Sequence, residues 1–345
     1  MTFLYLRGRY NFNGLYILFF ITICILPSVQ YAVGTDYYSY ERIYTIDSVL
    51  EHYYDNGEFA FFYFVKVLQL ISRDAKFFFM AVSILQSILI TVIFIKFKKV
   101  GFAVFFLFFL FFSVTNLMHT QMNIIRVSFS IYLFILSIFF KLEGKFLFSL
   151  MVFFIGCFFH KSTYAMLPFF ILPVSIYEAI YKKAGLFFLL SFLVCFFDPF
   201  GRYVPVIIET IFPSYSIYYV DGESLINVSI LNVLTKLYYL PVNILFIYFL
   251  WRNVFQLSIF EKRLIGFWVI ISSSYFLSYH YGFFSRVNFF LVFYYIIPIY
   301  YVFSLFRKRN NAVLLISLIG YIILPYIFKV VFFPLAEFHY ETFLF

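Results

Sequence analysis

Charged residues are scarce in this chain of 345 residues, where Asp, Glu, Lys and Arg together make up 12%. Soluble globular proteins contain about 25% charged residues, so the scarcity excludes an ordinary soluble domain. Cysteine is also rare: Cys24, Cys157 and Cys195 lie in apolar runs without CxxC spacing, which argues against disulfides and metal ligation. The sequence has no glycine-rich phosphate loop, zinc-ligand spacing, nucleophile elbow or haem signature. No metal site is expected.

Long apolar runs, in contrast, make up much of the chain, in which 64% of the residues are hydrophobic. A helix that spans a bilayer needs roughly 20 apolar residues, with about 17–25 usual. The sequence therefore predicts an all-α polytopic membrane protein with about 11 transmembrane helices (range 10–13), in a single membrane domain over residues 1–345. The predicted spans are 13–33, 76–95, 101–118, 124–140, 146–160, 163–178, 184–198, 231–251, 264–281, 287–304 and 312–333. The runs 146–160, 163–178 and 184–198 are short enough to be tilted, broken or re-entrant.

The run 57–72 is apolar but short, and Lys66 interrupts it. We predict an interfacial or re-entrant helix there, because the charge distribution then follows the positive-inside rule. With a cytoplasmic N-terminus, 15 of the 25 basic residues and only three of the 16 acidic residues fall in the inner loops. The net charge of +9 is thereby explained without nucleic acid. A long loop near 199–230 is expected outside.

The same orientation gathers titratable side chains on the outer face. All five histidines are predicted at or near it: His52, His119, His160, His280 and His339. The segment Gly34–Tyr44 carries Asp36 and is followed by the acids Asp47, Glu51, Asp55 and Glu58. Such a segment must lie in water or in a polar cavity, because an unpaired charge in the bilayer costs at least ~2.5–3.5 kcal/mol. Chemistry or recognition is therefore expected on that face.

Two arginines, Arg126 and Arg286, each enter an apolar helix from the predicted outer side. A guanidinium at that depth needs an anionic partner, and its planar fork suits carboxylate or phosphate. For Arg126 alone, a snorkelling side chain or a pair with a nearby protein acid is as good an interpretation as a ligand. Two arginines at matching depths favour a shared anionic ligand, for which a diphosphate is the natural candidate.

Three further residues are candidates for proton transfer. His160 lies between two short apolar runs, where an imidazole with an unperturbed pKa of ~6.5 is a candidate general base. It could equally bond a sugar, or a carbonyl at a helix end, and Lys161 adds positive charge beside it. Asp36 and Glu58 are the acids best placed to accept a proton from a glycosyl acceptor hydroxyl. The other acids of this region are expected to be solvated surface residues.

Taken together, these motifs resemble the EpsG/Wzy-type polysaccharide polymerases over roughly residues 15 to 305. The resemblance rests on Gly34-Thr35-Asp36 with Tyr40, the acid Glu58, Asn123-x-x-Arg126, Phe159-His160-Lys161-Ser162, and Arg286. It implies a membrane glycosyltransferase on the periplasmic or extracellular face of a bacterial inner membrane. Such an enzyme transfers a growing glycan from a polyprenyl diphosphate carrier onto a lipid-linked repeat unit. The product would be capsule, O-antigen or exopolysaccharide.

The resemblance also implies roles for single residues. Arg126 and Arg286 would bind the diphosphates, and Asp36 or His160 would activate the acceptor hydroxyl. Substrate contacts are further expected from Glu58, Tyr40, Lys161 and His280. The diphosphate-linked donor supplies the energy, so no cofactor is expected. Partners would be the undecaprenyl-diphosphate-linked oligosaccharide, the lipid bilayer and, in the cell, a flippase and a chain-length regulator; nucleic acid is not among them.

Other classes of protein make different demands on the sequence. A transporter or flippase for lipid-linked saccharides would distribute charges along an inner cavity and often contain an internal repeat, and neither is visible. A membrane O-acetyltransferase would take its acyl donor from the cytoplasmic side, where this chain offers basic loops but no histidine. A non-catalytic scaffold would leave the paired arginines unexplained. The pattern therefore favours the polymerase.

Overall fold

The computed structural model describes residues 13–197, 237–277, 282–332 and 336–344, together with residues 206, 210 and 334. Only the backbone is described for residues 13–16, 194–197, 273–277 and 282–286. The described chain is helical, and its one pairing of strand type is an isolated bridge between Gln30 and Thr342. The predicted outer loop near 199–230 lies outside the described residues, apart from residues 206 and 210.

Helices coincide, at least in part, with every predicted span. In chain order they are α2 (Asn13–Ser28), α3 (Tyr37–Thr45), α4 (Asp47–Asp55), α5 (Phe59–Ile71), α6 (Ala75–Lys99), α7 (Val104–Ser113), α8 (Leu117–Asn123), α9 (Ile125–Leu142), α10 (Phe146–Phe159), η1 (Lys161–Met166), α11 (Leu167–Ile171), α12 (Val174–Lys182), α13 (Ala184–Phe197), α18 (Leu240–Trp251), α19 (Ile259–Leu277), α20 (Gly282–Leu291), η3 (Val292–Tyr295), α21 (Ile296–Lys308), α22 (Ala312–Ile327), η4 (Phe328–Phe332) and η5 (Ala336–Phe338).

Four of the described helices are long and apolar enough to cross a membrane, and two bent pairs raise the number to six. The four are Ala75–Lys99, Ile125–Leu142, Val287–Lys308 and Ala312–Phe332, and five shorter apolar helices of 10–17 residues accompany them. The prediction of an all-helical membrane protein is therefore confirmed. The count of about 11 crossings stays a prediction.

Both bent pairs have a local cause. Between α7 and α8 the chain turns by 55°, and Asn116 there adopts a left-handed conformation with φ of 54°, which asparagine tolerates better than most residues. Between α11 and α12 the turn is 63°, and Pro173 immediately precedes α12. Lys141 closes this second break, because its Nζ donates to the carbonyl oxygens of Phe170 and Leu172 at the end of α11. Carbonyls at a helix end have no partner within the helix.

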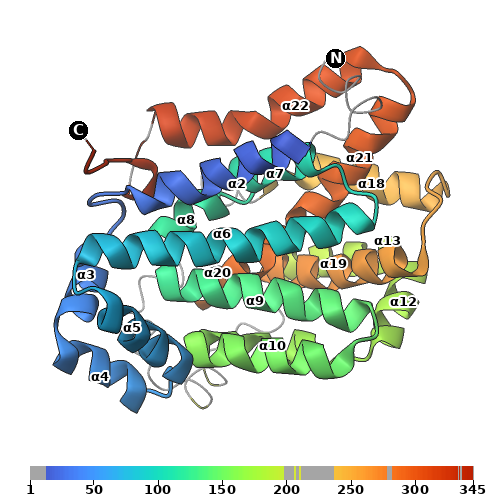
Figure 1. Ribbon diagram of the computed structural model, residues 1–345. Coiled ribbons are helices and arrows are strands. Elements are labelled where there is room, and N and C mark those ends of the chain that lie inside the picture. The colour runs from blue at the N-terminus through green and yellow to red at the C-terminus, as the bar shows by residue number, and fades with distance from the viewer. Residues whose placement is uncertain are drawn as a thin grey trace. The chain divides into compact units, whose positions relative to one another are not determined.

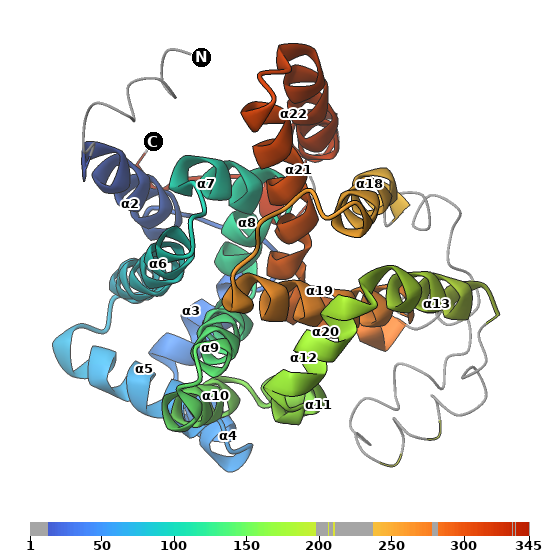
Figure 2. The ribbon, with the colours of Figure 1, turned by 90° about the vertical axis from the view of Figure 1, so that its right-hand side faces the viewer.

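The chain divides into two compact units. Unit 1 contains residues 1–137, 149–163 and 326–345, and unit 2 contains residues 138–148 and 164–325. The prediction of a single membrane domain stays a prediction. In unit 1, α9 and α10 lie side by side (Figures 1 and 2), and the Ser130 hydroxyl donates to the Gly156 carbonyl between them.

The helices α3, α4 and α5 gather at the end of unit 1 where α6 begins (Figure 1). Their inner faces bury large aromatic side chains, among them Tyr44 and Phe61, in one core that also includes Phe78 of α6. The Tyr44 ring stacks on Phe78 with centroids 5.0 Å apart. This core fixes α3, which carries Tyr40, and α5, which Glu58 immediately precedes.

Unit 2 is built around α19. Trp268 of that helix is fully buried between Phe188 and Phe246, with ring centroids 5.7 and 5.4 Å away. Gly266 allows α19 to approach α12 closely, since a Cβ at that position would lie 1.9 Å from the Tyr177 carbonyl oxygen. The backbones of α12 and α19 therefore touch where glycine leaves room.

Candidate functional site

The first functional side chain, Arg126, stands at the start of α9. The backbone N–H of Arg126 donates to the Tyr40 hydroxyl at 3.2 Å. N–H groups in the first turn of a helix have no partner within the helix, so Tyr40 of α3 supplies one. Burial raises the pKa of Tyr40, which keeps its hydroxyl protonated while the oxygen accepts this bond.

The guanidinium of Arg126 is held from several sides. Its Nη1 donates to Oε2 of Glu58, the residue preceding α5, whose side chain is only 3% exposed. The Tyr53 ring lies against the guanidinium, with its centroid 4.3 Å from Cζ, a geometry in which the cation and the aromatic face attract. Among the described residues the buried Nε has no hydrogen-bond partner. Arg126 is thus paired with a protein carboxylate, one of the arrangements expected from the sequence.

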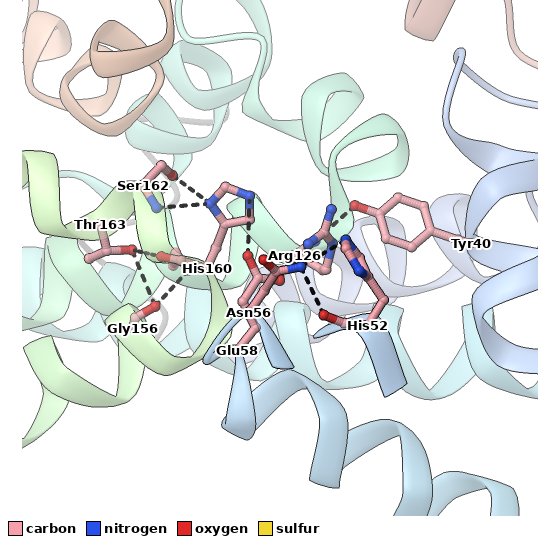
Figure 3. Close-up of polar contacts among 10 residues, drawn as sticks. Tyr40, His52, Asn56, Glu58, Arg126, Gly156, His160, Ser162 and Thr163 are labelled. Carbon is pink, nitrogen blue, oxygen red and sulfur yellow. Dashed lines mark hydrogen bonds and ion pairs between the residues drawn. The ribbon is translucent and has the colours of Figure 1, made fainter. Parts of the chain in front are cut away.

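His160 follows α10 and meets the same carboxylate. Its Nε2 lies 3.8 Å from Glu58 Oε1, while Glu58 Oε2 accepts a hydrogen bond from Arg126 Nη1 (Figure 3). Its Nδ1 accepts the backbone N–H of Ser162 at 3.2 Å and lies 2.6 Å from the Ser162 hydroxyl. A ring nitrogen that accepts an N–H carries no proton, so the neutral imidazole bears its proton on Nε2, toward Glu58. The local turn Lys161–Met166 thereby sets the tautomer of His160.

The result is one carboxylate that accepts from the Arg126 guanidinium of α9 and lies 3.8 Å from the imidazole of His160, the residue after α10. Taking both charges of an ion pair out of water is costly, and the pair persists only where geometry and further hydrogen bonds are favourable. Here the Tyr53 ring and the His160 imidazole supply that support. A guanidinium has five N–H donors, and Glu58 engages Nη1, so the group can hold a further anion while staying fixed in place.

Asp36 belongs to a neighbouring contact, with the last residue of α8, which directly precedes α9. The Asp36 backbone N–H donates to Asn123 Oδ1 at 3.0 Å, and the Thr35 hydroxyl donates to Asp36 Oδ1 at 3.1 Å. Gly34 has φ of +77° and lies so close that a Cβ there would be 2.4 Å from Asn123 Oδ1. Only glycine meets both demands without strain. The motifs Gly34-Thr35-Asp36 and Asn123-x-x-Arg126 are therefore two sides of one contact.

The structure brings four of the predicted site residues together: Tyr40, Glu58, Arg126 and His160 (Figure 3). Asp36 lies one helical turn before Tyr40, whose N–H donates to the Asp36 carbonyl, and Lys161 is exposed next to His160. Arg286 is on α20, but its side chain lies outside the described residues, as does His280 altogether. Their convergence with the four residues stays a prediction.

The sequence did not predict the roles of three residues of the site. Tyr53 is one of 32 tyrosines and carries no motif that sets it apart. Ser162 and Asn123 stand inside quoted motifs, yet their roles as partners of His160 and Asp36 depend on backbone geometry. Among the acids expected at the surface, Asp47 is exposed and pairs with Lys66 at 2.9 Å, where Lys66 and Arg73 lower the pKa of its carboxyl.

Comparison with models of known protein families identifies most of the chain. Residues 13–342 match the model of the EpsG family. No curated protein and no solved structure matches the chain. The match includes the whole of the Tyr40, Glu58, Arg126 and His160 cluster.

Proposed function

The chain belongs to the EpsG family, which is associated with polysaccharide biosynthesis, and on this premise we propose that it is a polysaccharide polymerase. Its substrate is a polyprenyl-diphosphate-linked oligosaccharide repeat unit in a bacterial inner membrane. The reaction takes place on the periplasmic or extracellular face, and the N-terminus is cytoplasmic. The acceptor is the terminal sugar of a second lipid-linked unit.

One observation carries the proposal: a half-buried arginine, fixed by a carboxylate and an aromatic ring, at the first turn of a helix long and apolar enough to span a membrane. The diphosphate of a lipid-linked substrate lies at the level where such a helix begins. The planar fork of a guanidinium binds two phosphate oxygens at once. Arg126 would thus stabilise the departing diphosphate as its charge develops, with Arg286 as the proposed second cation.

In the proposed reaction the acceptor hydroxyl oxygen attacks the anomeric carbon of the donor glycan. The bond from that carbon to the diphosphate oxygen breaks, the hydroxyl proton passes to a protein base, and the polyprenyl diphosphate leaves as an anion. The hydrogen bonds around His160 support Asp36 as that base. His160 Nδ1 is engaged by Ser162, and the Nε2 proton points at Glu58, so His160 has no ring nitrogen free to receive a proton in this arrangement.

The variant His160→Asn separates the two candidate bases. An asparagine oxygen can accept the Ser162 N–H as a helix cap, so the variant should fold. If Asp36 is the base, polymer formation should fall less than tenfold, whereas a general base typically contributes 10²–10⁴-fold. The initial rate of polymer formation and the melting temperature in detergent check this. A loss above 100-fold at an unchanged melting temperature would assign the base to His160.

The function itself is tested with purified protein and a lipid-diphosphate-linked repeat unit, read as a ladder of glycan lengths. Arg126→Lys keeps the charge but loses the fork, and should lower the rate of polymer formation at least tenfold, toward the 10²–10³-fold cost of losing an oxyanion-hole donor. Arg73→Lys is the matched control, because Arg73 is 58% exposed in a surface pair with Asp47. An unchanged ladder in Arg126→Lys and Arg126→Ala would refute the role of Arg126.

The same assay discriminates the other classes of function. Polymer formed in detergent, without any transmembrane gradient, excludes a purely transporting role. Wild-type protein that moves the lipid-linked unit across liposomes without lengthening it would show a flippase instead. Transfer of acetyl groups to a finished glycan, again without lengthening, would show the O-acetyltransferase.

A further inference from the structure

The sequence leaves open whether the run that contains α5 is an interfacial or a re-entrant helix, and we propose that α5 lies in the lipid headgroup region, with one face in the boundary of the acyl chains. Its partner on that face is the lipid surface itself. The inference concerns unit 1 alone and does not depend on the reaction that the protein catalyses.

The helix α5 has two apolar faces. Phe61, Val65 and Leu68 point into unit 1 and are at most 8% exposed. A second row at helical spacing faces outward: Tyr63 and Val67 are each 56% exposed, and Leu70 is 86% exposed. A soluble helix would carry polar residues on such a face, so this row calls for an apolar environment.

Length and charge together exclude a crossing, because α5, unlike the other short apolar helices described, has a lysine in its middle. The 13 residues of α5 extend over only about 20 Å at 1.5 Å per residue, against about 30 Å of hydrocarbon. The position of α5 relative to the membrane is set by the next helix. Only three residues separate it from α6, a 25-residue candidate span whose first turn is capped by Asp74. The exposed end of α5, at Leu70, is therefore close in the chain to the start of α6, where α6 would enter the bilayer.

The neighbouring helix α4 has the charged side chains that would face water. Asp47, Glu51 and Asp55 of α4 are all exposed, whereas Leu50 is buried against unit 1. Lys66, the one charged residue within α5, turns toward α4 and pairs with Asp47. Because the exposed charges are mainly acidic, the attraction to lipid must come from apolar area rather than from anionic headgroups.

Aromatic rings mark the boundary between these two environments. Tyr54 at the end of α4 lies 5.1 Å from the Phe59 ring and 6.2 Å from the Tyr63 ring, measured between centroids. Exposed tyrosines of this kind are enriched at the level of lipid headgroups. Glu58 immediately precedes Phe59, so the Glu58–Arg126 pair would lie at headgroup depth, open to ligands that arrive within the membrane plane.

Site-directed spin labels test this placement in the full-length protein, reconstituted into phosphatidylcholine vesicles. Val67→Cys and Leu70→Cys report on α5, and Glu51→Cys on α4 is the control, in a background with Cys24, Cys157 and Cys195 replaced by Ala. Labels at 67 and 70 should collide more often with oxygen, which concentrates in lipid, than with a water-soluble nickel chelate. The label at 51 should show the reverse preference.

Two outcomes would overturn the proposal. More frequent collisions with the nickel chelate at 67 and 70 would place the row in water, and protection from both reagents would show that protein covers it. Should the cysteine-free background not fold, Val67→Trp and Glu51→Trp in the otherwise native chain answer the same question. Bromine on the lipid acyl chains should then quench the added fluorescence at 67 several-fold more than at 51, and equal quenching would refute the placement.

Discussion

Glu58→Ala should lower the free energy of unfolding by about 3–5 kcal/mol and abolish polymer formation. Removing one partner of a largely buried ion pair leaves the other charge with little water and no counterion, which accounts for a loss of that size. Arg126 would be left against the Tyr53 ring, its carboxylate gone. The melting temperature of the purified protein in detergent and the polymer ladder measure the two effects.

Two companion variants separate structure from chemistry. The double variant Glu58→Ala, Arg126→Met should recover most of the lost stability, because an apolar side chain replaces the stranded charge, yet remain inactive. Asp47→Ala breaks an exposed pair with Lys66 and Arg73, and surface pairs contribute only about 0–1 kcal/mol. If Glu58→Ala melted no earlier than Asp47→Ala, the pair with Arg126 would have no role in holding unit 1 together.

Gly266→Ala should be among the most damaging single substitutions in unit 2. The added methyl group would lie 1.9 Å from the Tyr177 carbonyl oxygen and 2.7 Å from the carbonyl carbon. Backbone atoms cannot rotate away as a side chain does, so α12 and α19 would have to separate. Overpacking in a core costs about 1–3 kcal/mol and occasionally more, and we expect the upper end, seen as a lower melting temperature and reduced yield in the membrane.

Gly320→Ala provides the matched control within the same unit. Gly320 lies in α22, and an added Cβ there would meet no atom within 4 Å. Alanine is favoured over glycine in helix interiors by about 1 kcal/mol, so this variant should be as stable as the wild type or slightly more so. Equal melting temperatures for the two variants would contradict the close approach of α12 and α19.

The positions of the helices followed from composition along the chain, because apolar runs of sufficient length have few other structures available. The run 146–160 is α10 almost to the residue, and 57–72 contains the short helix α5. What could not be predicted is where a run breaks. Asn116 and Pro173 mark bends of 55° and 63°, yet asparagine and proline elsewhere in apolar runs, such as Pro325 within α22, leave the helix continuous.

The site was predicted in part for a similar reason. Arg126, His160 and Glu58 are rare polar side chains in apolar surroundings, which singles them out. The pair of Arg126 and Glu58 joins residues 68 positions apart in the chain. A single sequence does not show which residues so far apart lie close together in space. From the sequence alone, Arg126 fits a ligand-binding residue and a partner of a protein acid equally well. The structure shows the second contact directly.

The contact between Gly34 and Asn123 also has a consequence for the order of events during synthesis. Asp36 leaves the ribosome 87 residues before Asn123, the side chain that receives its N–H. At about 5–20 residues per second, the segment after α2 waits roughly 4–17 s for its partner to be made. Until α8 and the first turn of α9 have been made, Asp36 cannot bond to Asn123 and Tyr40 cannot bond to Arg126. The face that holds Arg126 is thus completed late, after α6 is already in the membrane.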